Sequence, residues 1–488
     1  MIMTKKRRRI LLAVIFLIVI SLFACSVYMQ SQLFASVDKH DLTTLTEELT
    51  LATENIHSTD KMKKLLTDWC EDNDIKYKVD SNKNIIISKE ADNAKDDMEV
   101  TVLAAEYNGK DLVDNISALA AAEYFAKHGL NGGDVHVVFL NNDGNYHTGA
   151  RNLSKKYVPK NARIILLTGG DSTRISNASF ASSLQTVSIP YTSVSNSCDS
   201  AIQIRIGGLE TGVPSDSISK QTNPITQLGT VLTWLKTKST TFQLADVKVE
   251  SNGNMYPTAI TATILINSYS LESVSAYLDK RIESFEDDNK DDYPDSYYEY
   301  EEITNNIPTE AYSKKATNRL TTFLYTFKNG TYRFDEENLP EDGDYEENDL
   351  YGVNCVENLW TEDGALKLRI NTSALNKDYL QQITTENQEA ATLSKVSIET
   401  NVTYASYSNE ESTLQTLIQN AYAKVNDTST VDSSIKEKTD SSFTAMTFLS
   451  AKNKNTDAVH IRLSNETDVK TVNAILNYPM MDRNIFGF

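Results

Sequence analysis

The sequence has few of the residues that cross-link a chain or break it. It holds 4 cysteines, and the three after Cys25 leave an odd number without a Cys-x-x-Cys pair, so neither a disulfide framework nor a structural zinc site is expected. Only 9 of the 488 residues are proline and 40% are hydrophobic, which favours a folded chain of two or three domains. Gly-x-Ser-x-Gly and phosphate-loop patterns are missing too, so the usual sequence signals of a serine hydrolase or nucleotide-binding loop are not found.

Positive charge is scarce outside the first 29 residues. The formal net charge is −20, and those 29 residues contribute +5 with no acidic residue, so the remainder carries −25. A body this acidic repels phosphate backbones, and nucleic-acid binding is therefore not expected.

A basic run at 5–9 is followed by an apolar stretch at 10–29 that only Ser21 and Ser26 interrupt. At about 1.5 Å per residue, twenty helical residues span roughly 30 Å, the thickness of one hydrocarbon core. We therefore predict a single-pass cell-membrane protein with a cytoplasmic N-terminus and an extracytoplasmic body. A cleaved signal peptide is the alternative, and Cys25 after Leu-Phe-Ala would then suit lipoprotein processing.

Continuous apolar runs at 100–105, 135–140 and 163–168 are typical of strands buried on both faces of a sheet. An alanine-rich segment at 115–127 has helical character and separates the first two runs. Strands that alternate with helices predict an α/β domain with a mostly parallel sheet flanked by helices.

After residue 198 the apolar residues alternate with polar ones, as at 201–206 and 259–266, which predicts an antiparallel sheet with one wet face and an α+β domain. Two acidic segments, 286–302 and 335–349, are interpreted as solvated insertions. The predicted organisation is a cytoplasmic tail (1–9), a transmembrane anchor (10–29), a stalk (30–45), the first part of the α/β domain (46–198), the α+β domain (199–398) and the second part of the α/β domain (399–488).

Four stretches, taken in order, carry a more specific pattern. They are 51–60 with Asn84-Ile85-Ile86; Asp114-Asn115 with 118–122; 137–150; and 204–209 with Asn223 and 252–259. Their order and spacing resemble the dinuclear-zinc dipeptidases and exopeptidases of the aminoacyl-histidine dipeptidase and carnosinase type. The resemblance implies a zinc-exopeptidase-like domain, split in sequence, with an inserted α+β (ferredoxin-like) lid.

In that family two divalent cations share a bridging carboxylate and a water, and a glutamate takes the proton of the water. The resemblance places Asp114 at the bridging carboxylate, Asp143 at the general base and Asp171 at a further metal ligand, with Thr168 as an alternative to Asp171. Glu106 falls on the first histidine ligand. Asp114 as a helix cap and Asp143 as a turn residue are the simpler interpretations.

Four other positions lack the residue that the family has. Asn108 replaces a charged partner of the first ligand, and Gly144 replaces a glutamate ligand. Val213 stands for a substrate-binding histidine of the lid, and Arg462 for the last histidine ligand, where a cation opposes metal binding. None of the six histidines matches a ligand position; for two of them, His147 and His460, the interpretation is a surface or turn imidazole, with a relocated ligand as the alternative.

The sequence therefore predicts a membrane-anchored, zinc-dipeptidase-like protein that is catalytically inactive, needs no cofactor, and binds a peptide or protein. One alternative is an active metallo-exopeptidase that uses Glu106, Asp114, Asp143 and Asp171 around zinc or another divalent metal. A second alternative is a purely structural surface protein. Neither the ligand nor the oligomeric state follows from the sequence.

Overall fold

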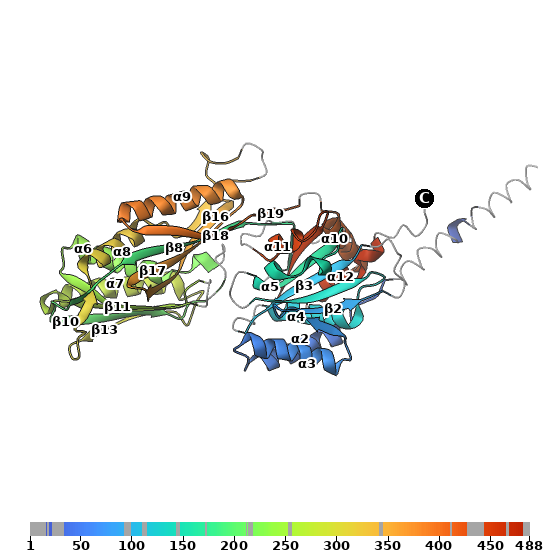
Figure 1. Ribbon diagram of the computed structural model, residues 1–488, viewed down its shortest axis with the longest axis horizontal. Helices are drawn as coiled ribbons and strands as arrows, with labels where there is room; N and C mark the ends of the chain where they lie inside the picture. The colour runs from blue at the N-terminus through green and yellow to red at the C-terminus, as the bar shows by residue number, and fades with distance from the viewer. Residues whose placement is uncertain are drawn as a thin grey trace, which may run out of the picture.

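The described residues from 34 onward form two bodies, and Figure 1 shows them next to each other along the long axis of the molecule. The first body contains both ends of this part of the chain, and the second is inserted between them. The computed structural model describes residues 16, 19–21, 34–91, 99–109, 115–142, 147–170, 173–210, 212, 218–251, 256–340, 345–409, 412–426, 444–464 and 468–481.

The first body is built on a seven-stranded sheet in the order β1-β2-β4-β3-β5-β20-β6. Its strands are β1 (Tyr77–Val79), β2 (Ile85–Lys89), β3 (Thr101–Tyr107), β4 (Val135–Asn141), β5 (Arg163–Gly170), β6 (Arg174–Ser176) and β20 (Asp457–Ser464). The pairings among β4, β3, β5 and β20 are parallel, whereas β1–β2, β2–β4 and β20–β6 are antiparallel. The sheet is thus mixed and not mostly parallel as predicted, because a short hairpin and the immediate chain reversal after β5 add antiparallel strands at its edges.

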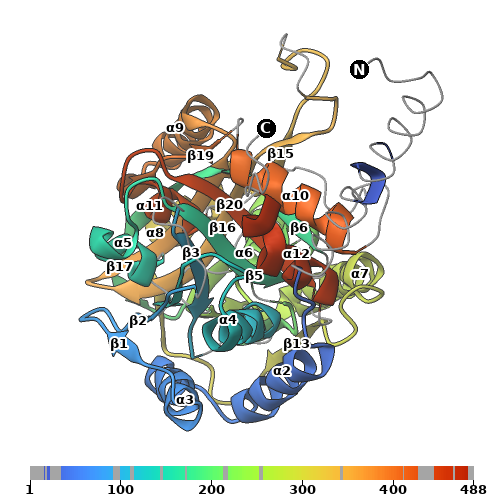
Figure 2. The same ribbon diagram turned by 90° about the vertical axis from the view of Figure 1, so that its right-hand side faces the viewer.

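Successive residues of the central strands enter two different hydrophobic cores. On β3, Leu103 and Ala105 join the core on one face, and Val102 and Ala104 join the core on the other. Figure 2 shows the helices around these strands. The first face packs against α2 (Lys39–Thr53), α3 (Thr59–Asp72), α4 (Ile116–His128), α10 (Thr413–Val425) and α12 (Val469–Met481), and the second against α5 (Thr148–Asn152) and α11 (Met446–Ser450). Because both faces are covered, the central strands have the continuous apolar runs seen in the sequence.

Part of the predicted stalk belongs to the folded body. Helix α2 starts at residue 39, and the Asp38 side chain accepts hydrogen bonds from the first backbone N–H groups. Leu42, Leu45 and Leu49 of this helix are 2–5% exposed and lie in the first core. The prediction of a stalk to residue 45 is therefore wrong, because a leucine stripe at helical spacing packs this segment onto the body.

The predicted membrane anchor at 10–29 lies outside the described residues except for residues 16 and 19–21. Within the part of the chain that the structure describes, no helix is long and apolar enough to cross a bilayer.

The second body contains a four-stranded antiparallel sheet in the order β11-β12-β10-β13. Its elements follow the chain as β10 (Ser200–Gly207), α6 (Pro224–Thr237), β11 (Phe242–Glu250), β12 (Ala259–Ile266), α7 (Leu271–Asn289) and β13 (Tyr297–Ile303). This is the β-α-β-β-α-β connectivity of a ferredoxin-like unit. The acidic segment 286–302 is not a solvated insertion, because it completes α7 and forms most of β13, where Tyr298 is buried between exposed neighbours.

A second sheet of this body was not predicted. It has the antiparallel order β15-β16-β17-β8-β18, and helices α8 and α9 pack against it. The elements are β8 (Ala181–Pro190), α8 (Lys314–Thr326), β15 (Gly330–Arg333), β16 (Leu350–Glu362), β17 (Ala365–Ala374), α9 (Lys377–Ser394) and β18 (Ser397–Tyr404). Since β8 pairs with β17 and β18, the second body spans 181–404 and not 199–398. The described residues of 335–349 connect β15 to β16 without forming a strand or helix.

Smaller elements complete the chain. Two crossings join the bodies, and on them β7 (Ala178–Ser179) pairs with β19 (Tyr407–Ser408), as the position of β19 in Figure 1 indicates. The remaining pieces are η2 (Lys155–Tyr157), β9 (Ser193–Ser195), η3 (Ile218–Lys220), η4 (Ser268–Ser270) and β14 (Glu310–Tyr312).

Candidate functional site

Polar side chains form a row across the carboxyl ends of the parallel strands. Glu106 ends β3, Thr168 lies near the end of β5, and Arg462 lies near the end of β20. By strand alternation all three project from the sheet face that α5 and α11 cover. Arg174 of β6 is directly opposite Arg462 and extends the row to the sheet edge. We call Glu106, Thr168, Arg462 and Arg174 the carboxyl-end row, since ligands of open α/β sheets bind at this end.

The side chain of Glu106 contacts His147. The His147 Nδ1 atom lies 2.7 Å from Oε1 and 2.9 Å from Oε2 of Glu106. The two side chains are only 13% and 11% exposed, so water screens their contact weakly. A carboxylate can only accept, which means that Nδ1 carries the hydrogen. The pair turns both Glu106 oxygens toward an imidazole of the same chain.

Close packing at the start of α5 holds His147 in place. His147 precedes the helix with φ of 53°, a left-handed conformation that few residues other than glycine adopt. A Cβ atom on Gly149 would lie 2.3 Å from Asn84 Oδ1. Asn84 is fully buried; its Oδ1 accepts from Asn141 N at 3.0 Å and its Nδ2 donates to Gly149 O at 3.1 Å. The helix thus sits directly against the strand ends, and only glycine fits at 149.

His460 is buried and contacts the row. Its Nε2 lies 2.7 Å from Thr168 Oγ1, and the residue is 4% exposed. The interpretation of His460 as a surface or turn imidazole is therefore wrong. β20 lies inside the sheet because β6, which was not predicted, pairs along its outer side and covers it.

Arg462 and Arg174 give the outer half of the row its positive charge. Arg462 is half-buried, and a Cβ atom on Gly170 would lie 2.4 Å from its Cδ, so the arginine stem lies along the glycine. Arg174 is exposed.

The Asn115 side chain links the ends of β3 and β5. It donates a hydrogen bond to the Glu106 carbonyl and accepts one from Gly169 N at 2.9 Å.

Most of the predicted site residues fall outside the part of the chain that the structure describes: Asp114, Asp143, Gly144, Asp171 and Val213. Asn108 is described and follows β3.

Of the predicted residues within the described ranges, the fold brings Glu106, Thr168 and Arg462 to one edge of the sheet. Sequence reasoning missed Arg174, which lies on a three-residue strand too short to show a period. It considers His147 as a surface or turn imidazole or a relocated ligand but misses the contact with Glu106, because the left-handed conformation of His147 has no sequence signature.

The described donors do not fit a pair of zinc ions. Both oxygens of Glu106 face His147, the Nε2 atom of His460 faces a hydroxyl, and Arg462 adds a positive charge where the family has a ligand. Across the described ranges, no group of three or more His, Cys, Asp or Glu side chains could hold a metal ion.

A carboxyl group is also buried in the second body. Glu357 is 0% exposed on β16, at an irregularity in its pairing with β17 between residues 356 and 358. Its Oε1 accepts a hydrogen bond of 2.7 Å from Asn371 Nδ2, while Oε2 has no hydrogen-bond partner among the described residues. Burial raises the pKa of Glu357 to about 8, although the Asn371 hydrogen bond and the Arg369 charge lower it in part.

Two recesses lie elsewhere on the molecule. A cavity of about 500 Å³ opens beside the end of α4 and the end of α12, with Lys89, Tyr124, His128 and Met480 among its lining residues. A smaller one of about 150 Å³ lies on the four-stranded sheet.

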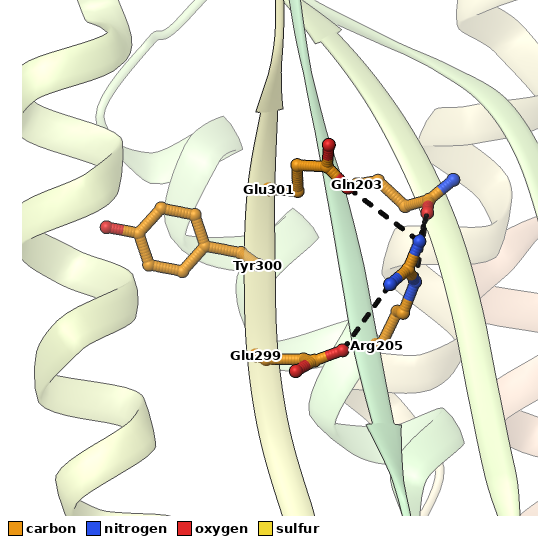
Figure 3. A pocket seen from close by; sticks show the side chains of 5 residues that line it. All are labelled: Gln203, Arg205, Glu299, Tyr300 and Glu301. Carbon is orange, nitrogen blue, oxygen red and sulfur yellow. Dashed lines mark hydrogen bonds and ion pairs between the residues drawn. The ribbon is translucent and has the colours of Figure 1, made fainter.

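Figure 3 shows the small recess, in which Arg205 points at Gln203, Glu299 and Glu301 while Tyr300 projects from the other side of β13. Arg205 is 3.5 Å from Glu299 and 3.8 Å from Glu301, so its charge is already used within the sheet. We assign no ligand to this recess.

Comparison with known proteins finds a likeness of fold. No protein-family model and no curated protein matches the chain. Solved structures do match, and the likeness to a dipeptidase among them is one of the two-body α/β fold.

Aminoacylhistidine dipeptidase from Vibrio alginolyticus is 13% identical, with a TM-score of 0.57 over 91% of this chain and 97% of that one. An aminopeptidase from Bacillus cereus is 10% identical, with a TM-score of 0.45 over 91% and 99% of the two chains. The likeness to the Vibrio alginolyticus dipeptidase confirms the peptidase fold that the sequence resemblance implied, and at 13% identity it concerns the fold alone.

Proposed function

We propose that this chain is a membrane-anchored, extracytoplasmic pseudopeptidase: a protein with the fold of a dipeptidase that does not hydrolyse peptides and instead binds a peptide or protein. One observation carries the proposal, namely that both oxygens of Glu106 face His147 Nδ1 at 2.7 and 2.9 Å. The Nδ1–H of the imidazole competes with a metal ion for the lone pairs of both oxygens and so weakens Glu106 as a ligand. Arg462, in the same row, adds repulsion toward a dication.

An active metallo-exopeptidase is the competing function. It is favoured by the carboxylates Asp114, Asp143 and Asp171, which follow β3, β4 and β5 in sequence, and by the fold shared with the dipeptidase from Vibrio alginolyticus. In that function Glu106 would release His147 and join these carboxylates around one zinc, manganese or magnesium ion. A purely structural surface protein is the third reading and requires that no peptide binds.

Metal content and hydrolysis, measured together on the full chain in detergent, separate these functions. After dialysis against zinc and manganese we expect far less than one metal ion per chain and no release of amino acids from a panel of dipeptides. The informative variant is His147→Ala, which frees the Glu106 oxygens. It should gain divalent-cation affinity relative to the parent, while the distant His136→Ala should not. Near-stoichiometric metal together with dipeptide cleavage in the parent chain would refute the proposal.

The N-terminal anchor is part of the same proposal. Its support is the basic run at 5–9 followed by the apolar stretch at 10–29, the order that keeps the N-terminus cytoplasmic. Protease added to intact cells should then degrade the extracytoplasmic body. A body that the protease leaves intact would face the cytoplasm and contradict this topology.

A further inference from the structure

The edge of the seven-stranded sheet opposite the carboxyl-end row carries the larger recess. The loop 129–133 leads into β4, and Lys89 at the end of β2 pairs with Val135 at the start of β4. The last turns of α4 and α12 reach the same edge and line the same recess of about 500 Å³. We call this edge the amino-end face, formed by residues 35–41, 89–91, 124–134 and 476–480.

The chain enters the folded body at the amino-end face and is fixed there. Ala35 N donates to Asn477 Oδ1 at 3.0 Å, and Asn477 Nδ2 donates to Ala35 O at 2.7 Å. Asn477 lies on α12 and is 0% exposed, so water does not compete for these hydrogen bonds. Farther on, Val37 joins the first core, and Asp38 N donates to the Tyr124 hydroxyl at 3.1 Å. The position of residue 35 relative to the sheet is therefore set by the fold.

We propose that the amino-end face lies against the lipid headgroups of the membrane, so that the carboxyl-end row opens away from it. The inference rests on the proposed function, in which residues 10–29 are the membrane anchor. Only residues 30–34 separate that segment from the fixed residue 35. At about 3.3–3.6 Å per residue, even a fully extended connection spans only roughly 20 Å. A tether this short keeps the amino-end face next to the headgroups.

The charge of the amino-end face suits a lipid surface better than the charge of the body as a whole. Its acidic side chains are Asp38, Asp41, Glu90 and Asp134, and its basic ones are Lys39, Lys89 and Lys127. The face is thus nearly balanced in charge, whereas the chain after residue 29 carries −25. Anionic headgroups repel the acidic body and repel this face far less.

This orientation leaves the carboxyl-end row open to ligands from outside. The strand β3 runs from the amino-end face to the row through 7 residues, and these span about 20 Å. Figure 1 places α12 on the side of the first body that faces away from the second. With the amino-end face on the lipid, both the row and the second body lie farther from the membrane.

Quenching of a fluorescent label by lipid tests the inference. The full chain is placed in vesicles of phosphatidylcholine and phosphatidylglycerol, in which part of the phosphatidylcholine carries a nitroxide on its headgroup. The label is attached to a single cysteine in a chain with Cys25→Ser and Cys198→Ser, because Cys70 and Cys355 are buried.

Three exposed positions take the label. Glu90→Cys lies on the amino-end face, Asn152→Cys on α5 at the opposite edge of the same body, and Tyr325→Cys on the second body. We expect the label at position 90 to lose most of its fluorescence and the labels at 152 and 325 to keep theirs. Asn152→Cys is the matched control, since it differs from Glu90→Cys only in the edge of the sheet that it reports.

A glycine-serine spacer of about twenty residues, inserted after residue 31, tests the role of the short tether. The label at position 90 should then regain fluorescence while the chain stays in the vesicles. Equal quenching at 90 and 152, or no quenching at 90, in a chain that floats with the vesicles overturns the orientation and leaves the anchor intact. A chain that does not float with the vesicles refutes the anchor, and this inference with it.

Discussion

Replacing Glu357 with glutamine should make the second body more resistant to alkaline unfolding. Glu357 has a pKa of about 8 in the folded chain, against an ordinary value of 4.5, because burial disfavours its charged form. At a pH between these two pKa values, Glu357 keeps its proton in the folded chain but has released it in the unfolded chain. The stability from this group is thus complete below pH 4.5 and is lost as the pH rises through 8.

The size of the effect follows from the shift in pKa. A shift of this size corresponds to about 5 kcal/mol at most, at roughly 1.36 kcal/mol per unit. Glutamine cannot ionise, and its oxygen can still accept the 2.7 Å hydrogen bond from Asn371 Nδ2. Glu357→Gln should therefore match the parent chain near pH 5 and exceed its free energy of unfolding by several kcal/mol near pH 9.

Urea unfolding of the full chain at pH 5, 7 and 9 measures the difference, with tryptophan fluorescence as the signal because Trp234 and Trp360 both lie in the second body. Glu389→Gln, at an exposed position on α9, is the matched control and should give one small difference at all three pH values. If Glu357→Gln differs from the parent by the same amount at pH 5 and pH 9, the reasoning about its burial is wrong.

Three further outcomes test other parts of the structure. Leu42→Ala should lower the free energy of unfolding by about 2–5 kcal/mol. Leu51→Ala on the same helix, where the side chain is 67% exposed, should change it by less than about 0.5 kcal/mol. Equal effects of the two substitutions would show that this helix does not pack on the body. Gly149→Ala should cost about 1–3 kcal/mol in thermal unfolding, since its Cβ would meet Asn84, and an unchanged melting temperature would contradict that packing. Deleting residues 1–29 should move the protein from the membrane fraction to the soluble fraction, and membrane retention would exclude an N-terminal anchor.

The central sheet could be predicted from sequence because a strand that is buried on both faces has a continuous run of apolar residues. The runs at 100–105, 135–140 and 163–168 correspond to β3, β4 and β5, and most residues of each run are buried. The order of short motifs also gave the peptidase fold. Both kinds of signal are local, or depend only on order along the chain.

The rest of the fold depends on contacts that local patterns do not record. The strand β13 carries three acidic residues in seven, which is typical of a loop, yet pairing with β10 and the burial of Tyr298 make it a strand. The second sheet was not predicted because its strand pairs, such as β8 with β17, join segments that lie almost two hundred residues apart in sequence.

The candidate site was predicted only in part for the same reason. A motif alignment locates Glu106 and Arg462, since both occupy positions where the family has a ligand. It cannot show that His147 turns back onto Glu106, or that Arg174 faces Arg462 from a strand of three residues. These contacts arise from tertiary packing, which a local sequence pattern does not record.

The short ladder between β7 and β19 has a consequence for how this molecule can be divided. Ser182, near the start of the second body, is the register partner of Tyr404 at its end, so that body enters and leaves on neighbouring strands. Just outside them, Ala178 pairs with Ser408. A module whose ends already touch can be excised whole or transplanted, and the gap it leaves needs only a tight connecting turn to close.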